Sequence, residues 1–206
     1  EWNYNLNNES EATNSLSQDQ VVTEEFTARV TDEQGASATQ TITMTITGAN
    51  DAPIVTAIVS EKTHEDSPFT INLLSAVNDP EGDTLSIVNT SSSATKGGLS
   101  TIIPSDTLSL DDATSILTVV PSKFSLASSD VVVITYNYSV SDGRVETANT
   151  ATITITGTNN APIISASVPS SGSVTEDDPT SISGIISASD VDNDTLTLQI
   201  SRNPSY

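Results

Sequence analysis

A repeat with a period near 110 residues constrains this chain more than any other feature. The segment TGANDAPIV at residues 47–55 returns as TGTNNAPII at residues 156–164. Three acidic motifs return at almost the same spacing: THEDSP as VTEDDP, DPEGDTL as DVDNDTL, and VTDEQG as VSDGRV. Because these separate landmarks agree, the chain is predicted to consist of tandem copies of one structural unit.

The landmarks divide the chain out of phase with its own repeat. Residues 1–51 are the C-terminal half of one unit, residues 52–161 are a complete unit, and residues 162–206 are the N-terminal half of a third. The chain is therefore expected to be an internal piece of a longer protein. Two explanations of the cut ends stay open. Either the boundary ignores the domains, or the halves complete one another between chains by strand addition, which would build a filament.

The sequence predicts an all-β fold. Short runs rich in Val, Ile and Thr are bounded by Gly, Pro, Asp or Ser clusters, and no segment carries a sustained 3.6-residue period. Residues 90–114 are rich in Ser, Thr and Gly and fit either a long hairpin or a loop. Such closely spaced short strands indicate an immunoglobulin-like β-sandwich. The strands predicted for the complete unit are 54–60, 69–75, 84–89, 99–103, 115–120, 131–140 and 145–156.

Composition and charge exclude several classes of function. Six Lys and Arg residues against 27 Asp and Glu residues give a formal net charge of −21, so neither nucleic acid nor an anionic membrane is an expected partner. The same excess of acids strains the folded state unless divalent cations offset it. The absence of cysteine excludes disulfides, thiolate zinc sites and a cysteine nucleophile. No apolar run approaches the roughly 18 residues of a membrane span.

The ordered motifs resemble two families of bacterial repeats. Residues 52–161 resemble the cadherin-like (tandem-95) repeat through NDAPIV, HEDSPFTINLL, NDPEGDTLSIV, ITYNYSVSDG and TATITITGTNNAP. EWNYNLNN and EEFTARVTDEQG in the first part, and SVTEDDPTSISG and DVDNDTLTLQIS in the last, are similar to VCBS repeats. The resemblance implies tandem immunoglobulin/cadherin-like sandwiches from a large RTX-type adhesin on a bacterial cell surface. It implies an extracellular extender segment rather than a binding tip.

The resemblance also implies calcium at the joints between units. Ca²⁺ takes about six to eight oxygen ligands from carboxylates, carbonyls and water. In cadherin junctions a linker acid, a DxD loop and an acid from a later loop share calcium, and the spacings here are similar. The ligands implied for the first joint are Asn50, Asp51, Asp79, Glu81, Asp83 and Asp142. Those implied for the second are Glu65, Asn159, Asn160, Asp190, Asp192 and Asp194, with Asp130 as a further candidate.

The two joints are not expected to be equal. The second carries Asn160 where the first carries Asp51, so weaker calcium binding is expected at the second. The DPEGD and DVDND loops open like EF-hand loops. Neither continues as one, because Thr90 and Ser201 stand where an EF-hand needs its bidentate Glu.

No other constellation predicts catalysis or another cofactor. His64 is the only histidine and is predicted to lie in a surface loop rather than in a zinc site or a catalytic triad. Trp2, Tyr4 and Leu6 alternate along a predicted strand, where core packing is favoured over stacking on a sugar. The many pairs of acidic residues do not exclude carboxylate catalysis, but no enzyme is expected.

The sequence therefore predicts a mechanical spacer. Its expected partners are neighbouring repeats of the same polypeptide or identical chains arranged head to tail. The alternatives are a ligand- or glycan-binding module and an accessory module of a secreted enzyme.

Overall fold

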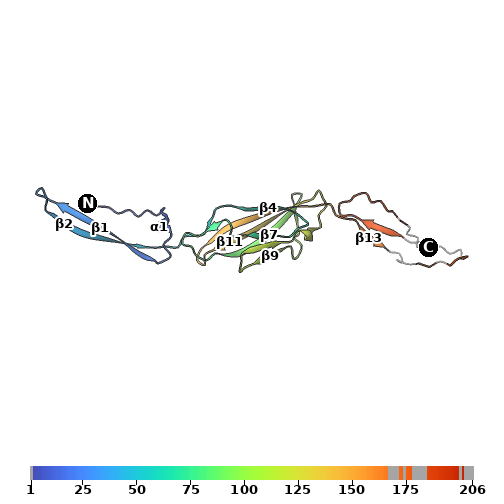
Figure 1. Ribbon diagram of the computed structural model, residues 1–206, viewed down its shortest axis with the longest axis horizontal. Helices are drawn as coiled ribbons and strands as arrows, with labels where there is room; N and C mark the ends of the chain where they lie inside the picture. Colours follow the sequence, from blue (N-terminus) through green and yellow to red (C-terminus); the bar gives the residue numbers. More distant parts are fainter. Residues whose placement is uncertain (1, 167–171, 174, 178–184, 200, 202–206) are drawn as a thin grey trace.

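The structure is a computed structural model that describes residues 2–166, 172–173, 175–177, 185–199 and 201. The chain forms an extended rod with three parts in sequence order (Figure 1). We call them the N-terminal unit (residues 2–49), the central sandwich (residues 54–156) and the C-terminal unit (residues 163–201). The two linkers between them are the repeated segments that the sequence singles out.

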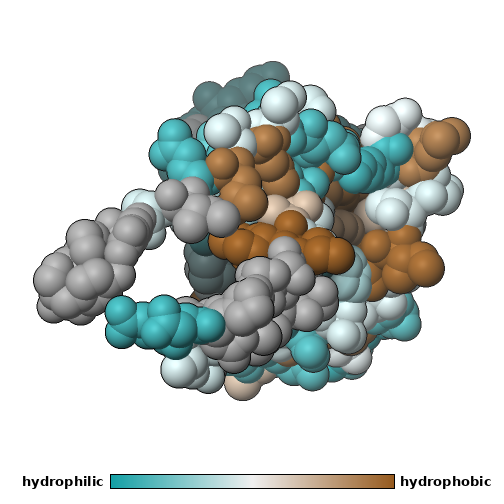
Figure 2. All heavy atoms as spheres, turned by 90° about the vertical axis from the view of Figure 1, so that its right-hand side faces the viewer, coloured by the Kyte–Doolittle hydropathy of each residue, from teal (hydrophilic) through white to brown (hydrophobic). Residues whose placement is uncertain are grey.

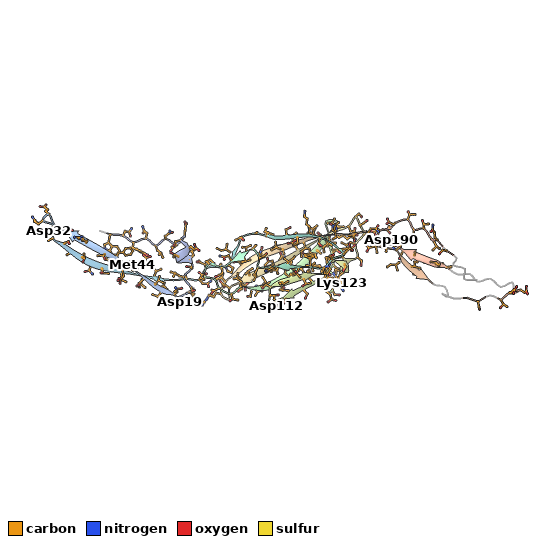
Figure 3. The ribbon with its side chains drawn as sticks, viewed as in Figure 1. Asp19, Asp32, Met44, Asp112, Lys123 and Asp190 are labelled. Atoms are coloured by element: carbon orange, nitrogen blue, oxygen red, sulfur yellow. The ribbon has the colours of Figure 1, made fainter. Side chains whose placement is uncertain are left out.

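The N-terminal unit is one helical turn followed by one long hairpin. Helix α1 (Glu11–Asn14) is capped by the Ser10 hydroxyl, which accepts the N–H of Thr13 at 3.2 Å. Strands β1 (Val21–Thr31) and β2 (Ser37–Thr47) pair antiparallel over their whole lengths. The turn that joins them carries Asp32 and forms the outer tip of the rod (Figure 3).

The central sandwich consists of two facing sheets. Five strands form one sheet in the order β4-β12-β11-β7-β8, and three form the other in the order β5-β10-β9. Strand β3 pairs with β6 beside the first linker, and β4 with β12 is the one parallel pair of this unit. The elements are β3 (Ile54–Val55), β4 (Val59–His64), β5 (Phe69–Asn72), β6 (Val77–Asn78), β7 (Ser86–Lys96), β8 (Leu99–Thr101), β9 (Leu108–Asp111), β10 (Ile116–Val119), the 3-10 turn η1 (Pro121–Phe124), β11 (Val131–Ser141) and β12 (Glu146–Thr156).

Strict alternation in the two longest strands produces the core. In β11 every second residue from Val132 to Val140 is buried, and in β12 Ala151, Ile153 and Ile155 are buried. Outward positions of the same strands are largely polar, which is the pattern of a sheet with one covered face. Tyr138 on β11 links the two layers, because its hydroxyl donates to the carbonyl of Leu73 at 3.1 Å.

The C-terminal unit is described over two short strands and one loop. Strands β13 (Ile163–Ala166) and β14 (Ile186–Ser189) pair antiparallel, as β3 and β6 do after the first linker. Most of the remaining predicted half-unit, including much of residues 167–184, lies outside the described residues. Figure 2 looks along the rod from this end and shows apolar side chains at the surface.

The predicted all-β architecture is confirmed, and the strand predictions at 69–75, 115–120, 131–140 and 145–156 correspond to β5, β10, β11 and β12. The prediction at 54–60 is wrong in detail. The chain there crosses between sheets, with β3 pairing with β6 and β4 with β12.

The Ser/Thr-rich stretch at 90–114 is largely strand, and the prediction that a strand ends at residue 89 is wrong. Strand β7 continues to Lys96 because a bulge at Asn89, with φ 53°, lets it stay paired with β11. Strand β8 follows through a Gly97–Gly98 turn in which both φ angles are positive, and β9 was not predicted.

The predicted strand over residues 2–6 is also wrong. These residues lie against the face of the hairpin rather than along its edge. The Tyr4 ring meets the Phe26 ring edge-on at 5.8 Å, while Trp2 is 62% exposed.

Candidate metal centre and the two junctions

The first linker is held from both sides by Asn50. Its backbone N–H donates to the Gln18 side chain of the N-terminal unit at 2.9 Å. Its side-chain amide donates to Asp142 of the central sandwich, also at 2.9 Å. Thr147 then binds the carbonyl of Pro53 through its hydroxyl at 2.8 Å. The linker is therefore a bonded joint between the two units.

The DPEGD loop folds around one buried carboxylate. Asp79 is 7% exposed, and its Oδ1 accepts the N–H groups of Glu81 at 3.1 Å and Asp83 at 3.0 Å. Gly82 completes the turn with φ 76°, a conformation that favours glycine. Glu81 reaches back to the linker, where its Oε1 accepts the N–H of Asp51 at 3.0 Å.

Three buried oxygens at this joint have no hydrogen-bond donor. They are Oδ1 of Asn50, Oδ2 of Asp79 and Oε2 of Glu81. Burial raises the pKa of Glu81 above its ordinary value, and the charges of Asp51 and Asp79 raise it further. Its hydrogen bonds to backbone N–H groups lower the pKa, but by less than burial raises it. Because buried polar atoms are nearly always paired, these three oxygens have room for a hydrogen-bond donor, a water molecule or a cation.

Asp142 contributes to the first joint through hydrogen bonds. The Asn50 amide lowers the pKa of Asp142 below its ordinary value, and the N–H groups of Val145 and Arg144 lower it further. Both its oxygens therefore already have donors. The side chains of Asp51 and Asp83 are exposed at the margin of the joint.

The residues of the first joint fit a hard cation such as Ca²⁺. The available ligands are two carboxylate oxygens and one amide oxygen, which are the donor types that Ca²⁺ prefers. Among the described residues no three acid or histidine side chains are already gathered around one point. The remaining ligands would have to be carbonyls, water or an inward turn of an exposed acid.

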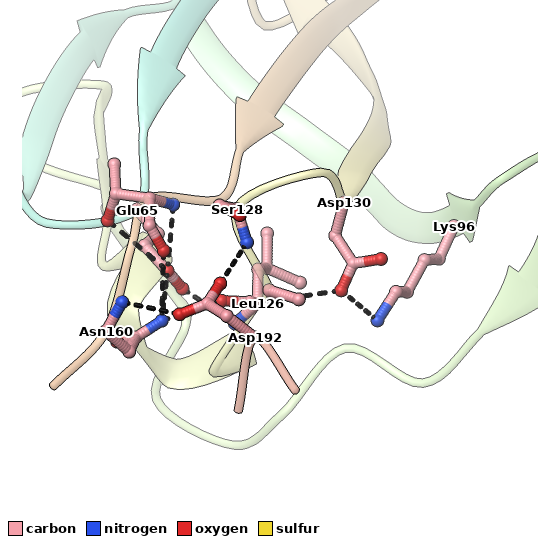
Figure 4. Close-up of polar contacts among 9 residues, drawn as sticks. Glu65, Lys96, Leu126, Ser128, Asp130, Asn160 and Asp192 are labelled. Atoms are coloured by element: carbon pink, nitrogen blue, oxygen red, sulfur yellow. Dashed lines mark hydrogen bonds and ion pairs between the residues drawn. The ribbon is translucent and has the colours of Figure 1, made fainter. Parts of the chain in front are cut away.

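The second joint is closed by hydrogen bonds centred on Glu65 (Figure 4). Glu65 is 2% exposed; its Oε2 accepts the N–H of Leu126 at 2.7 Å and its Oε1 that of Thr158 at 3.2 Å. The Asn160 amide donates to Glu65 at 3.2 Å and to the carbonyl of Leu126 at 2.9 Å. Glu65 thus lies against the linker, and its oxygens are bound by N–H groups.

Asp192 repeats the role of Glu81 with more donors. Its carboxylate accepts the N–H of Asn160 at 2.6 Å and also the N–H of Ser128 in the central sandwich. These two backbone bonds lower the pKa of Asp192 below its ordinary value. Asp190, which is labelled at this joint in Figure 3, accepts the N–H of Asp192 at 2.7 Å. The side chains of Asn159 and Asp194 are exposed.

Asp130 is bound by a protein cation. Lys96 lies 2.5 Å from its carboxylate (Figure 4), and this contact lowers the pKa of Asp130 below its ordinary value. The N–H of Ala127 donates to the same oxygen at 2.9 Å.

The two joints therefore differ in what neutralises their acids. At the first, buried oxygens of Asn50, Asp79 and Glu81 are left without donors. At the second, Glu65 and Asp192 are surrounded by N–H donors. Sequence reasoning ranked the joints by the loss of one carboxylate at Asn160, but it did not identify these donors.

Sequence reasoning also missed the glycine that begins each linker. A Cβ at Gly157 would collide with the carbonyl oxygen of Ala127 and lie 2.9 Å from Cβ of Leu126. A Cβ at Gly48 would collide with the carbonyl oxygen of Ser17 in the same way. The TG step shared by the two repeated segments was the available signal.

Replacing Gly157 with alanine should lower the free energy of unfolding by about 1–3 kcal/mol, because backbone atoms must move to admit the methyl group. Urea denaturation of the whole chain measures the change. Asn159→Ala, on an exposed residue of the same linker, is the control. Superimposable curves for Gly157→Ala and the unchanged chain would contradict the expectation.

His64 is the last residue of β4 rather than a loop residue, so that prediction is wrong in detail, although the side chain is exposed as expected. Among the described residues, no helix is long and apolar enough to cross a membrane.

Residues 50–156 match a family described as the bacterial Ig domain. No curated protein matches the chain. Among solved structures, a variant of an endo-fucoidan hydrolase from glycoside hydrolase family 107 is 19% identical over 66% of this chain and 19% of its own, with a TM-score of 0.35.

Two further structures are similar at a comparable level. One is a nucleoside hydrolase-related hypothetical protein from Saccharophagus degradans, described as associated with carbohydrate metabolism. It is 18% identical over 54% of this chain and 26% of its own, with a TM-score of 0.33. The other is the titin domains z1z2 in complex with telethonin, 12% identical over 66% and 62%, with a TM-score of 0.28. This chain spans only about a fifth of the hydrolase, and similarities this distant give no information on function.

Proposed function

This chain belongs to the bacterial Ig domain family, and we propose that it is a calcium-rigidified spacer of a bacterial surface adhesin or a related extracellular fibre. Bacterial Ig-like domains are commonly extracellular or exposed on the cell surface. The elongated arrangement in Figure 1 suits a spacer that holds another element away from the cell. In this proposal the repeats are of the cadherin-like and VCBS kinds, and the chain has no catalytic role.

The proposed units are residues 1–51, 52–161 and 162–206, of which only the middle one is complete. Support comes from the hairpins of the first two. β1 and β11 are each eleven residues long and begin 110 residues apart, and both are followed by an eleven-residue partner strand. The helical turns α1 and η1 precede them at the same offset.

One observation carries the calcium part of the proposal. The unpaired, buried oxygens of Asn50, Asp79 and Glu81 lie on the linker and on the loop that binds it. A cation held by these oxygens would join the linker to the loop of the central sandwich, so it would fix the angle between the two units. Bound calcium would supply positive charge to the oxygens that no N–H group of this joint contacts.

Thermal unfolding with calcium and with EGTA tests this function. A ligand bound only by the folded state stabilises it by about 2.7 kcal/mol at about 100 times its dissociation constant. For a unit of this size that corresponds to a rise of about 10–20 °C in Tm. Small-angle scattering on the same samples should give a longer maximum dimension with calcium, because the first joint stiffens.

The proposal would be wrong if neither the Tm nor the scattering curve changed on chelation. Asp112→Asn is the matched control for charge, since Asp112 is exposed in the turn after β9, away from both linkers (Figure 3). That variant should keep the full calcium response.

One observation favours a second candidate, a glycan-binding module. Trp2, Tyr4 and Phe26 line a hollow of about 220 Å³ on the face of the N-terminal hairpin. Aromatic rings of this kind stack on sugars as well as on other side chains. Binding of oligosaccharides that is lost in Trp2→Ala would favour this reading over the spacer.

A further inference from the structure

Strand β4 is the main connection between the first linker and the sheets of the central sandwich. The chain passes from this linker through β3, which pairs with β6 over two residues, and then enters β4. Among the described residues β4 pairs with β12 alone. Strand β12, which leads into the second linker, also pairs with β11 along its whole length. Of the two strands that lead to the linkers, β4 is therefore attached to its sheet by fewer bonds.

The direction of the β4–β12 pair decides how tension between the linkers acts on it. The strands run parallel, and all six residues of β4 are paired, from Val59 opposite Ala151 to His64. The linkers leave the sandwich at opposite ends, one before β4 and one directly after β12 (Figure 1). Tension therefore pulls the two strands along each other in opposite directions. The hydrogen bonds of the pair then bear the load together, whereas a pair that is pulled apart from one end breaks one bond at a time.

The core opposes any sliding of β12 along β4. Ala151, Ile153 and Ile155 of β12 are fully buried and alternate with outward residues. Val59 of β4, which is 9% exposed, packs in the same core. A shift of one residue along the pair would turn the buried side chains outward. The strands can therefore slide only after several of their bonds and core contacts have broken together.

A buried carboxylate extends the connection past the end of β4. The N–H of Glu65 donates to the carbonyl of Thr156 at 3.1 Å, which continues the pairing by one residue. The carboxylate of Glu65 accepts the N–H of Thr158 and the side-chain amide of Asn160, both at 3.2 Å. Thr158 and Asn160 lie beyond β12, in the segment that tension draws away from β4. Because Glu65 is 2% exposed, water does not compete for these bonds.

We propose that the central sandwich bears tension between its two linkers through the parallel pair β4–β12 and a latch formed by Glu65. The pair resists sliding and the latch holds its end, so the sandwich keeps its length under load. This inference rests on the proposed function, because a spacer is under tension whenever the cell and the element it holds are drawn apart. It needs no cation, since the protein itself makes each of these contacts.

Single-molecule force measurements on the whole chain in EGTA test the dependence on direction. The chain has no cysteine, so pairs of cysteines can serve as attachment points. Ala52→Cys with Ala161→Cys applies force at the two linkers, whereas Ser67→Cys with Ala161→Cys applies it at one end of the β4–β12 pair; all three residues are exposed. At the same pulling speed, the linker arrangement should need at least about twice the unfolding force of the one-end arrangement. Equal unfolding forces would overturn the proposal.

The latch is tested by comparing mechanical and thermodynamic losses. Leu117→Ala is the matched control, because Leu117 is fully buried on β10 of the other sheet and its truncation also destabilises the core. Bonds that break before the transition state set the rate of unfolding. For the same loss of free energy of unfolding in urea, Glu65→Ala should therefore lower the force in the linker arrangement at least about twice as much as Leu117→Ala.

Glu65→Gln gives a second measure of the latch in a variant that keeps the length of the side chain and one acceptor oxygen. Its unfolding force in the linker arrangement should lie between those of Glu65→Ala and the unchanged chain. A force in Glu65→Gln equal to that of the unchanged chain would overturn the latch. So would equal mechanical losses in Glu65→Ala and Leu117→Ala, because Glu65 would then contribute only to overall stability.

The outcomes separate this inference from the calcium site. If the linker arrangement is the stronger one in EGTA while chelation leaves the Tm unchanged, load bearing is supported and the calcium mechanism fails. If calcium raises the Tm while the two arrangements unfold at equal force, the calcium-bound spacer stands and the load path through β4 and β12 is overturned.

Discussion

Replacing Glu65 with alanine should lower the free energy of unfolding by about 3–5 kcal/mol, the largest effect we expect from a single substitution. The carboxylate is 2% exposed and accepts the N–H groups of Leu126 and Thr158 and the amide of Asn160. Alanine leaves the N–H groups of Leu126 and Thr158 without an acceptor, while the Asn160 amide keeps only the carbonyl groups of Leu126 and Thr158. Hydrogen bonds to a charged group contribute about 1.5–3 kcal/mol each. Removing one partner of a buried charged pair costs about 3–5 kcal/mol, which is the loss expected here.

Urea denaturation of the full chain in EGTA measures this loss. Glu61→Ala is the matched control, because Glu61 lies on the same strand, β4, with an exposed side chain. The control should change the free energy of unfolding by no more than about 0.5 kcal/mol. An effect of Glu65→Ala that appears only in calcium would show instead that Glu65 acts through a cation.

The two joints should therefore respond differently to chelation. N–H donors and Lys96 surround the acids of the second joint, so its geometry does not require an ion. Sequence reasoning expected the second joint to bind calcium more weakly because Asn160 replaces an acid. The structure gives that amide a different use, since it donates to Glu65 and to the carbonyl of Leu126.

Much of the fold was predictable because the repeat and the alternation are both present in the sequence itself. In TATITIT at 150–156, buried and outward-facing residues alternate strictly. A shift of the strand by one residue would turn the buried residues outward, so the pattern fixes the register. The Ser/Thr-rich half of β7 has no such signal. It is a strand because β11 lies beside it and because Asn89 adopts a positive φ, and neither fact is visible in its own residues.

The candidate site was likewise predictable only in part. The resemblance to cadherin-like repeats implied that Asp79, Glu81 and Asp142 belong near the first linker. Which oxygens already have donors depends on the path of the backbone, so the spacing could not separate the bonded Asp142 from the unpaired oxygen of Asp79. Gln18 was missed because its role is to hold Asn50 from the far side of the joint.

Replacing Asp79 with alanine should abolish the calcium response and also lower the free energy of unfolding without calcium by about 2–4 kcal/mol. Without calcium, the loss comes from its Oδ1, which caps the N–H groups of Glu81 and Asp83. The calcium response is lost because the substitution removes Oδ2, one of the three oxygens without a donor. Asp79→Asn keeps an acceptor for the two N–H groups, so it should regain most of the stability in EGTA but little of the calcium response. If Asp79→Asn responded to calcium like the unchanged chain, the site would not be at this loop.

The dependence of this response on pH follows from Glu81. Burial raises its pKa, so without a cation the folded state favours the protonated form, and the stability that this gives is lost as pH rises through the pKa of the folded state. Calcium binds the ionised form and must displace that proton. The difference in Tm between calcium and EGTA should therefore grow as pH rises from about 4 to about 7. Glu81→Gln removes this titration and should flatten the dependence, whereas the control Asp112→Asn should leave it intact. A calcium effect equal at both ends of the range in the unchanged chain would exclude Glu81 as a ligand.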